Sequence, residues 1–416
     1  MENQISLFEE ETSEIDENAP EFIQNAWKKA KQDMKKAFSE KQMLPYDEKL
    51  ERQKEKAYEF LHEMESRGFG CHVSVGGLDS ITLFVWLHSI GIHVPGISVS
   101  GVEDKGNQLV HKALGIEMIK SYKTKAKVLN ECGFPVISKK IAGRIDLLQH
   151  PTDDNKTVRH AIITGECGEQ GHFAKNSRMK LPQKWLKLFG GYENENENVN
   201  YGKPTNPEFL VSNDCCYWLK EKPCDDWAKE HKSFPYLGMM ASEGGQREEA
   251  LVEHGCNYYG KTVMRSAPFA IFMRNDILKL ALEMDKWYHE NVKLFEELYY
   301  KQPYSKDKDG NVIPYKELDT IIPQAYGEIA QHENGDYYTT RAQRTGCSMC
   351  GFGIHLEERP HRFDRLREDN PLEWQYWMYH CCKDKNGNDY GWGKVLDYIG
   401  VPWEDYPAIQ IELDLR

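Results

Sequence analysis

The sequence lacks a long apolar run. None of the uninterrupted apolar segments in its 416 residues approaches the roughly 20 residues that a membrane-spanning helix needs. The first residues are acidic, whereas a secretory signal begins with basic ones. We therefore expect no membrane span, no secretory signal and a cytoplasmic location.

An excess of positive charge is lacking too. A net charge of −13 disfavours a protein coated with basic surface for duplex nucleic acid, although it leaves a local basic channel open. Hydrophobic residues make up 40% of the chain and charged residues 29%, which is typical of a globular protein. The length exceeds the usual size of one core, so we expect one large domain with additions, or two domains.

Disulfides are not expected among the eleven cysteines, because thiols in the cytoplasm are kept reduced. Metal binding or redox chemistry is the better account of so many cysteines in such a chain.

The ends and loops divide the chain by composition. Residues 1–21 carry eight acidic side chains and neither Lys nor Arg, which predicts a mobile acidic tail. Residues 22–69 read as a helical extension that is interrupted near Pro45. The stretch 190–207, with its Glu-Asn repeats, predicts an exposed insertion. We expect a nucleotide-binding domain over 70–300 and a C-terminal cysteine-bearing region over 301–416 that packs on it.

Apolar segments alternate in type after residue 70. Residues 70–75 suit a buried strand and 78–90 a helix, and strand-like stretches at 94–99 and 116–119 flank a helix-like stretch at 108–114. This alternation predicts an α/β fold, doubly wound around a mostly parallel sheet.

The turn between the first strand and its helix reads Val75-Gly76-Gly77-Leu78-Asp79-Ser80. Backbone N–H groups converge at such a turn on phosphate oxygens, and a Cβ would block close approach of the anion. Ser80 could donate its hydroxyl to a phosphate, and Asp79 could cap the helix or help to hold Mg²⁺. No Gly-Lys-Ser/Thr follows, so this is not a Walker loop. A strand-to-helix turn that happens to contain two glycines is an equal alternative.

Two cysteine doublets lie far apart in the chain. Cys215 and Cys216 are adjacent, whereas Cys347 and Cys350 form a Cys-x-x-Cys motif. Four thiolates suit a zinc ion or a 4Fe-4S cluster. Adjacent cysteines reach one small ion with difficulty, which favours the cluster and leaves zinc, or ordinary buried cysteines, as alternatives.

These motifs resemble those of a known family. Val75 to Ser80 resembles the PP-loop signature Ser-Gly-Gly-x-Asp-Ser, and Cys-Cys-x-x-Leu-Lys-x-x-Pro with a distant Cys-x-x-Cys looks like the 4Fe-4S pattern of adenylyl-sulfate reductases. The resemblance runs from about Gly70 to Trp403 and looks closest to the phosphoadenosine phosphosulfate (PAPS) reductase family. It implies an adenine nucleotide alpha-hydrolase-like, Rossmann-like fold, a nucleotide at the PP-loop and a 4Fe-4S cluster. Val75 replaces the first serine of the signature.

The resemblance also assigns residues. The implied cluster ligands are Cys215, Cys216, Cys347 and Cys350, and the implied nucleotide-binding residues are Ser74, Gly76, Gly77, Asp79, Ser80, Ser138, Lys139, Glu243, Arg247 and Arg344. Ser138 and Lys139 match a Gly-x-Pro-x-x-Ser-Lys loop, with a surface Lys-Lys pair as the alternative. Glu243 and Arg247 match a Glu-Ser-x-x-Arg segment, but residues four apart also pair on an ordinary helix.

Sulfonucleotide reduction or related sulfur transfer is the activity that the resemblance implies, with a thiol carrier such as thioredoxin as partner. The family's C-terminal Glu-Cys-Gly-x-His motif, which bears the nucleophile, is absent here. By default we take Cys381 and Cys382 as core thiols. Either of them is only a speculative replacement for the missing nucleophile. One alternative is an ATP pyrophosphatase that adenylates a nucleic acid for thiolation or phosphorothioation. Another is a non-catalytic nucleotide-binding module.

Overall fold

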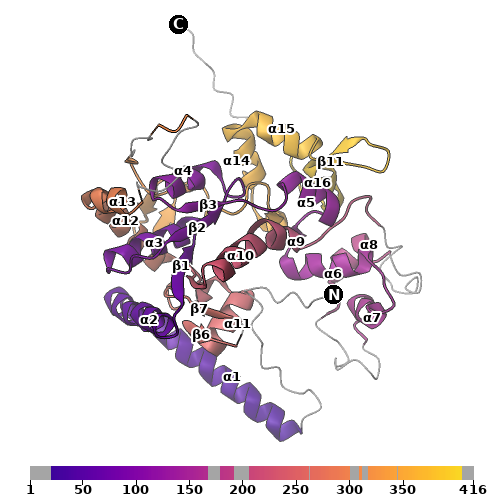
Figure 1. The fold of residues 1–416 in the computed structure, drawn as a ribbon. Coiled ribbons are helices and arrows are strands. Elements are labelled where there is room, and N and C mark those ends of the chain that lie inside the picture. The colour runs from indigo at the N-terminus through magenta and orange to yellow at the C-terminus, as the bar shows by residue number, and fades with distance from the viewer. Residues whose placement is uncertain are drawn as a thin grey trace. The chain divides into compact units, whose positions relative to one another are not determined.

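A computed structural model describes residues 20–166, 179–191, 206–261, 263–299, 309–311, 317–343 and 345–404 (Figure 1). By its internal contacts the chain divides into two compact units. Unit 1 comprises Met1–Ser121 with Lys220–Ser348, and unit 2 comprises Tyr122–Leu219 with Met349–Arg416. Each unit is therefore built from two separate stretches of sequence, whereas we expected contiguous regions over 70–300 and 301–416.

Unit 1 contains a six-stranded sheet in the order β3-β2-β1-β5-β7-β6. Neighbouring strands are parallel except for the antiparallel pair β6 and β7. The strands are β1 (Gly70–Ser74), β2 (Gly96–Val99), β3 (Glu117–Ile119), β5 (Ser233–Tyr236), β6 (Asn257–Tyr259) and β7 (Met264–Ser266). The expected α/β fold with a mostly parallel sheet is confirmed.

Helices cover both faces of this sheet. Alternate side chains of a strand point to opposite faces, and neighbouring side chains of β1 pack against different helices. His72 of β1 packs edge-on against Trp227 of α10, with ring centroids 5.2 Å apart. Its neighbours Cys71 and Val73 belong instead to the core that contains Phe60 of α2. The helices of unit 1 are α1 (Glu21–Gln42), α2 (Tyr46–Ser66), α3 (Leu78–Ser89), α4 (Lys105–Ala113), α10 (Lys222–Glu230), α11 (Gly245–His254), α12 (Arg274–Glu290) and α13 (Val292–Tyr299). A small antiparallel pair, β8 (Ile329–Gln331) and β9 (Tyr337–Thr339), completes the unit.

Local sequence explains several helix boundaries. The expected interruption near Pro45 is confirmed, because Pro45 has an extended backbone (φ −54°, ψ 146°) and caps α2. Helix α4 begins at Lys105, before the expected residue 108, because the carboxylate of Asp104 accepts a hydrogen bond from the N–H of Gly106. The first boundary follows from the fixed φ and missing N–H of proline, and the second from a side-chain cap.

Unit 2 is mainly helical around its own core. Its helices are α5 (Lys125–Cys132), α6 (Lys139–Gln149), α7 (Lys156–Thr164), α8 (Gln183–Phe189), α9 (Asp214–Cys216), α14 (Arg362–Asp369), α15 (Pro371–Tyr379) and α16 (Trp392–Ile399). Its strands form two short pairs, namely β4 (Val136–Ile137) parallel to β10 (Gly351–Phe352), and β11 (Cys382–Lys383) antiparallel to β12 (Asp389–Tyr390). Phe134 and Trp392 lie at the centre of this core, with ring centroids 5.0 Å apart.

Within the described ranges, no helix has both the length and the apolar character needed to cross a bilayer. Most of the expected acidic tail (residues 1–19) and most of the expected insertion (192–205) lie outside the described residues.

Candidate nucleotide site at the glycine turn

The turn at Gly76 and Gly77 lies where the order of parallel strands changes direction. It follows the carboxyl end of β1, and β1 pairs with β2 on one side and with β5 on the other. The crossover from β1 leads outward to β2 and β3, whereas β5 and β7 extend the sheet on the opposite side. In open α/β sheets, ligands bind outside the carboxyl ends of the strands at this point of reversal.

The turn is held in place by Ser80 in the first turn of α3. The N–H of Gly76 donates to Ser80 Oγ over 2.8 Å, and Ser80 Oγ donates to the carbonyl oxygen of Gly77 over 3.0 Å. Gly77 is the N-cap of α3 and has no side chain to cap it. The serine hydroxyl thus shapes the turn from within.

The segment after β5 packs directly against the start of α3. A Cβ at Gly238 would lie 3.0 Å from backbone atoms of Asp79 and Ser80. Backbone atoms cannot move aside as the end of a flexible side chain can, so a glycine is needed at this position for close contact between the two loops.

Two hydroxyl groups from a distant part of unit 1 lie against Gly77. Tyr326 Oη accepts a hydrogen bond from the N–H of Leu78 over 3.0 Å and contacts Thr345 Oγ1 at 2.7 Å. A Cβ at Gly77 would lie 2.5 Å from Tyr326 Oη and 3.2 Å from Thr345 Oγ1. The absence of a side chain at Gly77 therefore allows two hydroxyls, in addition to N–H groups, to gather at the start of α3.

Helix α4 presents two polar side chains to the turn, one helical turn apart. Asn107 Nδ2 donates to Thr345 Oγ1 over 3.1 Å, and His111 Nε2 lies 2.8 Å from the carbonyl oxygen of Gly76. Both side chains are fully buried. Burial lowers the pKa of His111, against a smaller opposing effect of the Glu103 carboxylate, which favours the neutral ring.

A partly buried ion pair borders the glycine turn. The carboxylate of Glu103, 6% exposed, pairs with the ammonium of Lys220. A Cβ at Gly76 would lie 3.2 Å from Glu103 Oε1. Glu103 also forms a backbone bridge with Cys347, which places the first cysteine of the Cys-x-x-Cys motif beside the glycine turn within unit 1.

Asp79 forms an ion pair and does not cap α3. Its Oδ1 lies 2.6 Å from Nη1 of Arg274, the first residue of α12, and Nη2 of the same guanidinium donates to the carbonyl oxygen of Gln343 over 2.8 Å. One arginine therefore connects the start of α3, the start of α12 and the chain just before Thr345.

The remaining expected nucleotide ligands have local roles. Ser138 in unit 2 caps α6 by accepting from the N–H of Ile141 over 3.2 Å, and Lys139 is exposed at the first position of that helix. In unit 1, Glu243 and Arg247 pair with each other across four positions, with the guanidinium half exposed. Ser74 ends β1 and pairs with Ile97. Arg344 lies outside the described residues.

Three of the four expected cluster ligands belong to unit 2 and Cys347 belongs to unit 1. Cys215 is buried and the other three are half-buried. Among the described residues, no three or more His, Cys, Asp or Glu side chains are gathered as for a metal ion. Within unit 2, however, the segments that carry two of the cysteines pair with neighbouring residues. Gly351, next to Cys350, pairs with Val136, and Val211, four residues before Cys215, forms a bridge with Phe134.

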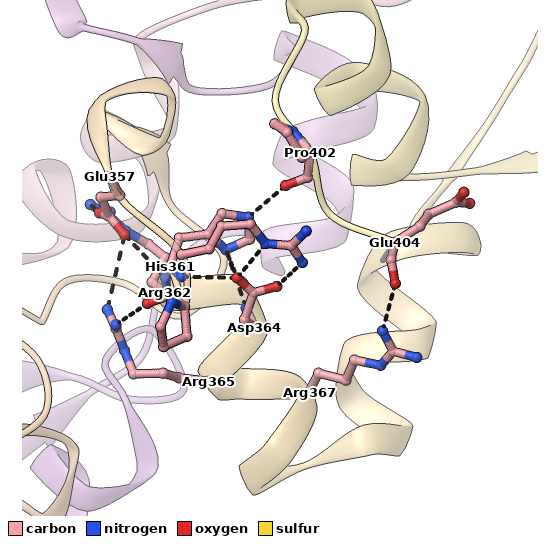
Figure 2. Close-up of polar contacts among 10 residues, drawn as sticks. Glu357, His361, Arg362, Asp364, Arg365, Arg367, Pro402 and Glu404 are labelled. Atoms are coloured by element: carbon pink, nitrogen blue, oxygen red, sulfur yellow. Dashed lines mark hydrogen bonds and ion pairs between the residues drawn. The ribbon is translucent and has the colours of Figure 1, made fainter. Parts of the chain in front are cut away.

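Cys350 is followed in the chain by a network of polar contacts, part of which is drawn in Figure 2. Arg362 donates to the carbonyl oxygen of Cys350 over 3.1 Å and is paired with Glu357. Asp364 accepts from the N–H of His361 over 2.9 Å, and His361 Nε2 lies 3.0 Å from the carbonyl oxygen of Pro402. His361 is therefore a helix-capping residue with satisfied nitrogens, which is the ordinary role for a lone histidine.

Cys381 and Cys382 are both buried in the core of unit 2, with their sulfur atoms 3.9 Å apart. Cys381 Sγ donates to the carbonyl oxygen of Trp377 over 3.3 Å. The hydrogen bond with Cys381, together with burial, raises the pKa of the Cys382 thiol well above its usual range. The Cys382 thiol therefore forms little thiolate, and the burial of both side chains gives the pair the environment of core cysteines.

Several residues at the turn carry no sequence signal strong enough to be selected in advance. They are Glu103, Asn107, His111, Lys220, Arg274, Tyr326 and Thr345. The four-residue spacing of Asn107 and His111 on a helix is the one pattern that could have indicated a shared polar face.

Comparison of the chain with protein-family models, with curated proteins and with solved structures gave no match. The argument for function therefore depends on the residues and contacts of the chain itself.

Proposed function

We propose that this chain is an adenine-nucleotide-binding enzyme related to the PAPS reductase family and the adenine nucleotide alpha-hydrolase-like proteins. The observation that carries the proposal is the position of Gly76 and Gly77 at the carboxyl end of β1, where the strand order reverses. An N-terminal helix dipole, a turn without side chains and nearby hydroxyls together suit phosphate or sulfate oxygens.

The proposed chemistry is sulfonucleotide reduction or a related sulfur transfer. Reduction of adenylyl sulfate to sulfite and adenosine 5′-phosphate takes two electrons, which a dithiol carrier supplies when it becomes a disulfide. The chain's contribution would be to hold the nucleotide phosphate at α3 and to orient the sulfate. The environment of Cys381 and Cys382 does not support either as a nucleophile, so attack on sulfur is assigned to no residue.

A 4Fe-4S cluster bound by Cys215, Cys216, Cys347 and Cys350 is part of the same proposal. Four cysteine thiolates are the donor set that such clusters take, and a cluster would supply iron sites able to pass electrons. Two placements support it. Within unit 2, Gly351 pairs with Val136 next to Cys350, and Val211, four residues before Cys215, forms a bridge with Phe134.

The test begins with binding. We expect isothermal titration of the purified full-length protein to show micromolar or tighter binding of at least one among AMP, adenylyl sulfate, phosphoadenylyl sulfate and ATP. Gly77→Val should abolish the binding, whereas Gly346→Val, at an exposed position where a Cβ has open space, should not. If none of the four nucleotides binds, the proposal is refuted.

Turnover then separates the enzymatic alternatives. Sulfite released from a sulfonucleotide, in the presence of reduced thioredoxin, would support the reductase. Conversion of ATP to AMP and pyrophosphate would favour the nucleic-acid-activating alternative. In that case Asp79 would be the carboxylate that holds Mg²⁺ at the turn, so Asp79→Asn should abolish the Mg²⁺ dependence. Tight nucleotide binding without either turnover would indicate a binding module.

A further inference from the structure

Beside the glycine turn, a chain of hydrogen bonds joins four groups that are distant in sequence. The N–H of Leu78 donates to Tyr326 Oη, Tyr326 Oη and Thr345 Oγ1 share one hydrogen bond, and Asn107 Nδ2 donates to Thr345 Oγ1. The two ends of this chain are both donors. Thr345 Oγ1 accepts from Asn107, and Tyr326 Oη accepts from the N–H of Leu78 and, over 3.4 Å, from the N–H of Thr345.

A count of hydroxyl protons shows that this row of hydrogen bonds contains one O–H group more than it has acceptors. The two hydroxyls carry two protons, and their shared hydrogen bond uses one of them, whichever oxygen donates. Within the described part of the molecule, neither Tyr326 nor Thr345 has a further acceptor for the second proton. One O–H group therefore has no acceptor among the described residues.

The orientation of the Asn107 amide does not remove this surplus. Asn107 is fully buried, and its Oδ1 has no hydrogen-bond partner among the described residues. If the amide were turned over, Oδ1 would accept the second hydroxyl proton, but the amide N–H groups would then be buried without an acceptor. In either orientation at least one donor has no acceptor among the described residues, and an oxygen of a ligand would supply one.

The position of the surplus donor indicates which oxygen it would meet. Tyr326 Oη and Thr345 Oγ1 lie 2.5 Å and 3.2 Å from the place of a Cβ at Gly77, at the positive end of the twelve-residue helix α3. An anionic oxygen is the acceptor that a helix N-terminus and a buried hydroxyl attract together.

We infer that Tyr326, Thr345 and Asn107 form the side of the nucleotide site that binds the anionic oxygens of the phosphate or sulfate group. This inference rests on the proposed function, since it takes the glycine turn as the nucleotide site. It assigns the recognition of the anion to residues more than 200 positions from the turn and to one residue on α4.

Binding of AMP and of adenylyl sulfate to full-length variants tests the inference. Tyr326→Phe and Thr345→Val each remove one hydroxyl and keep the shape of the side chain. Loss of a hydrogen bond to a charged group should raise the dissociation constant about ten- to hundredfold in each variant. Thr345→Ser keeps the hydroxyl and should bind as the wild type does. Tyr236→Phe is the matched control, because Tyr236 is a buried tyrosine of unit 1 whose hydroxyl donates to the carbonyl oxygen of Ala57 over 2.7 Å.

The outcomes are distinct from those that test the glycine turn. If the wild type binds and Tyr326→Phe and Thr345→Val bind equally well or more tightly, the hydroxyls are a cover for the turn and the inference is overturned. Weaker binding of both ligands supports contact with the 5′-phosphate, and weaker binding of adenylyl sulfate alone supports contact with the sulfate. The thermal midpoint of each ligand-free variant, compared with that of Thr345→Ser, shows whether a loss of affinity reflects unfolding. If the wild type binds neither ligand, the same variants are titrated with phosphoadenylyl sulfate and ATP, and the proposed function fails if the wild type binds neither of these.

Discussion

The imidazole of His111 donates a hydrogen bond from Nε2 to the carbonyl oxygen of Gly76, 2.8 Å away. A carbonyl oxygen can only accept, so the ring carries its proton on Nε2, and burial favours that neutral form by lowering the pKa of the ring. We expect His111→Leu to lower the free energy of unfolding by about 1–3 kcal/mol, because it leaves the Gly76 carbonyl without its donor. His111→Gln, whose amide N–H reaches a similar position, should retain most of the stability. Urea denaturation measures the free energy of unfolding of both variants. If the two are equally stable, the hydrogen bond from His111 to Gly76 does not contribute to stability.

Buried His72 predicts a loss of stability in acid. Burial, with a smaller contribution from His231, lowers the pKa of His72 from 6.5 to about 3. Below pH 6.5 the unfolded chain therefore binds a proton that the folded chain does not, so the contribution of His72 to stability is complete above pH 6.5. It falls by about 1.4 kcal/mol per pH unit as the pH drops toward 3.

A comparison of variants isolates this effect. Asp225 acts in the opposite direction, because burial raises the pKa of its carboxyl to about 7 and its ionisation costs stability as the pH rises. The contribution of Asp225 is the same in the wild type and in His72→Gln. Between pH 6.5 and 4.5, the stability of the wild type should therefore fall more steeply than that of His72→Gln by about 1.4 kcal/mol per pH unit. His332→Gln, at an exposed turn, should follow the wild type.

The strands β1, β2 and β3 were predictable from sequence, whereas β5, β6, β7 and the surroundings of the turn were not. The order of strand, glycine turn and helix over residues 70–90 depends on local apolar patterns, and β1 and α3 lie where those patterns place them. In contrast, Tyr326 reaches the N–H of Leu78 across 248 positions, and Asn107 reaches Thr345 across 238. No local pattern reports such a contact. Nor does a Ser-Lys motif distinguish a nucleotide ligand from a helix cap, and Ser138 is a cap here.

Gly77 should not tolerate a methyl group. A Cβ there would lie 2.5 Å from Tyr326 Oη, so Gly77→Ala must displace the buried tyrosine, whose ring belongs to a small core with Leu78 and Ile322. We expect a loss of about 1–3 kcal/mol in the free energy of unfolding. Tyr326→Phe removes the oxygen that clashes, so the double variant should recover part of that loss. A double-mutant cycle by chemical denaturation measures the coupling. Additive effects, or a cost for Gly346→Ala as large as for Gly77→Ala, would contradict the proposed contact.

The cysteine proposal predicts a metal content that depends on particular residues. Protein purified without oxygen should contain about four irons per chain, and about one zinc per chain would instead indicate a tetrahedral zinc site. Cys350→Ser and Cys215→Ser should each lower the iron content to a small fraction of that of the wild type, because loss of one thiolate exposes an iron to solvent. Cys132→Ser is the matched control, since Cys132 is a half-buried cysteine of the same unit outside both doublets. Arg362→Ala releases the carbonyl oxygen of Cys350 while keeping the thiol, so iron should still bind but be lost faster to a chelator. Iron content that is equal in Cys350→Ser, Cys215→Ser and Cys132→Ser would show that the doublets do not bind it.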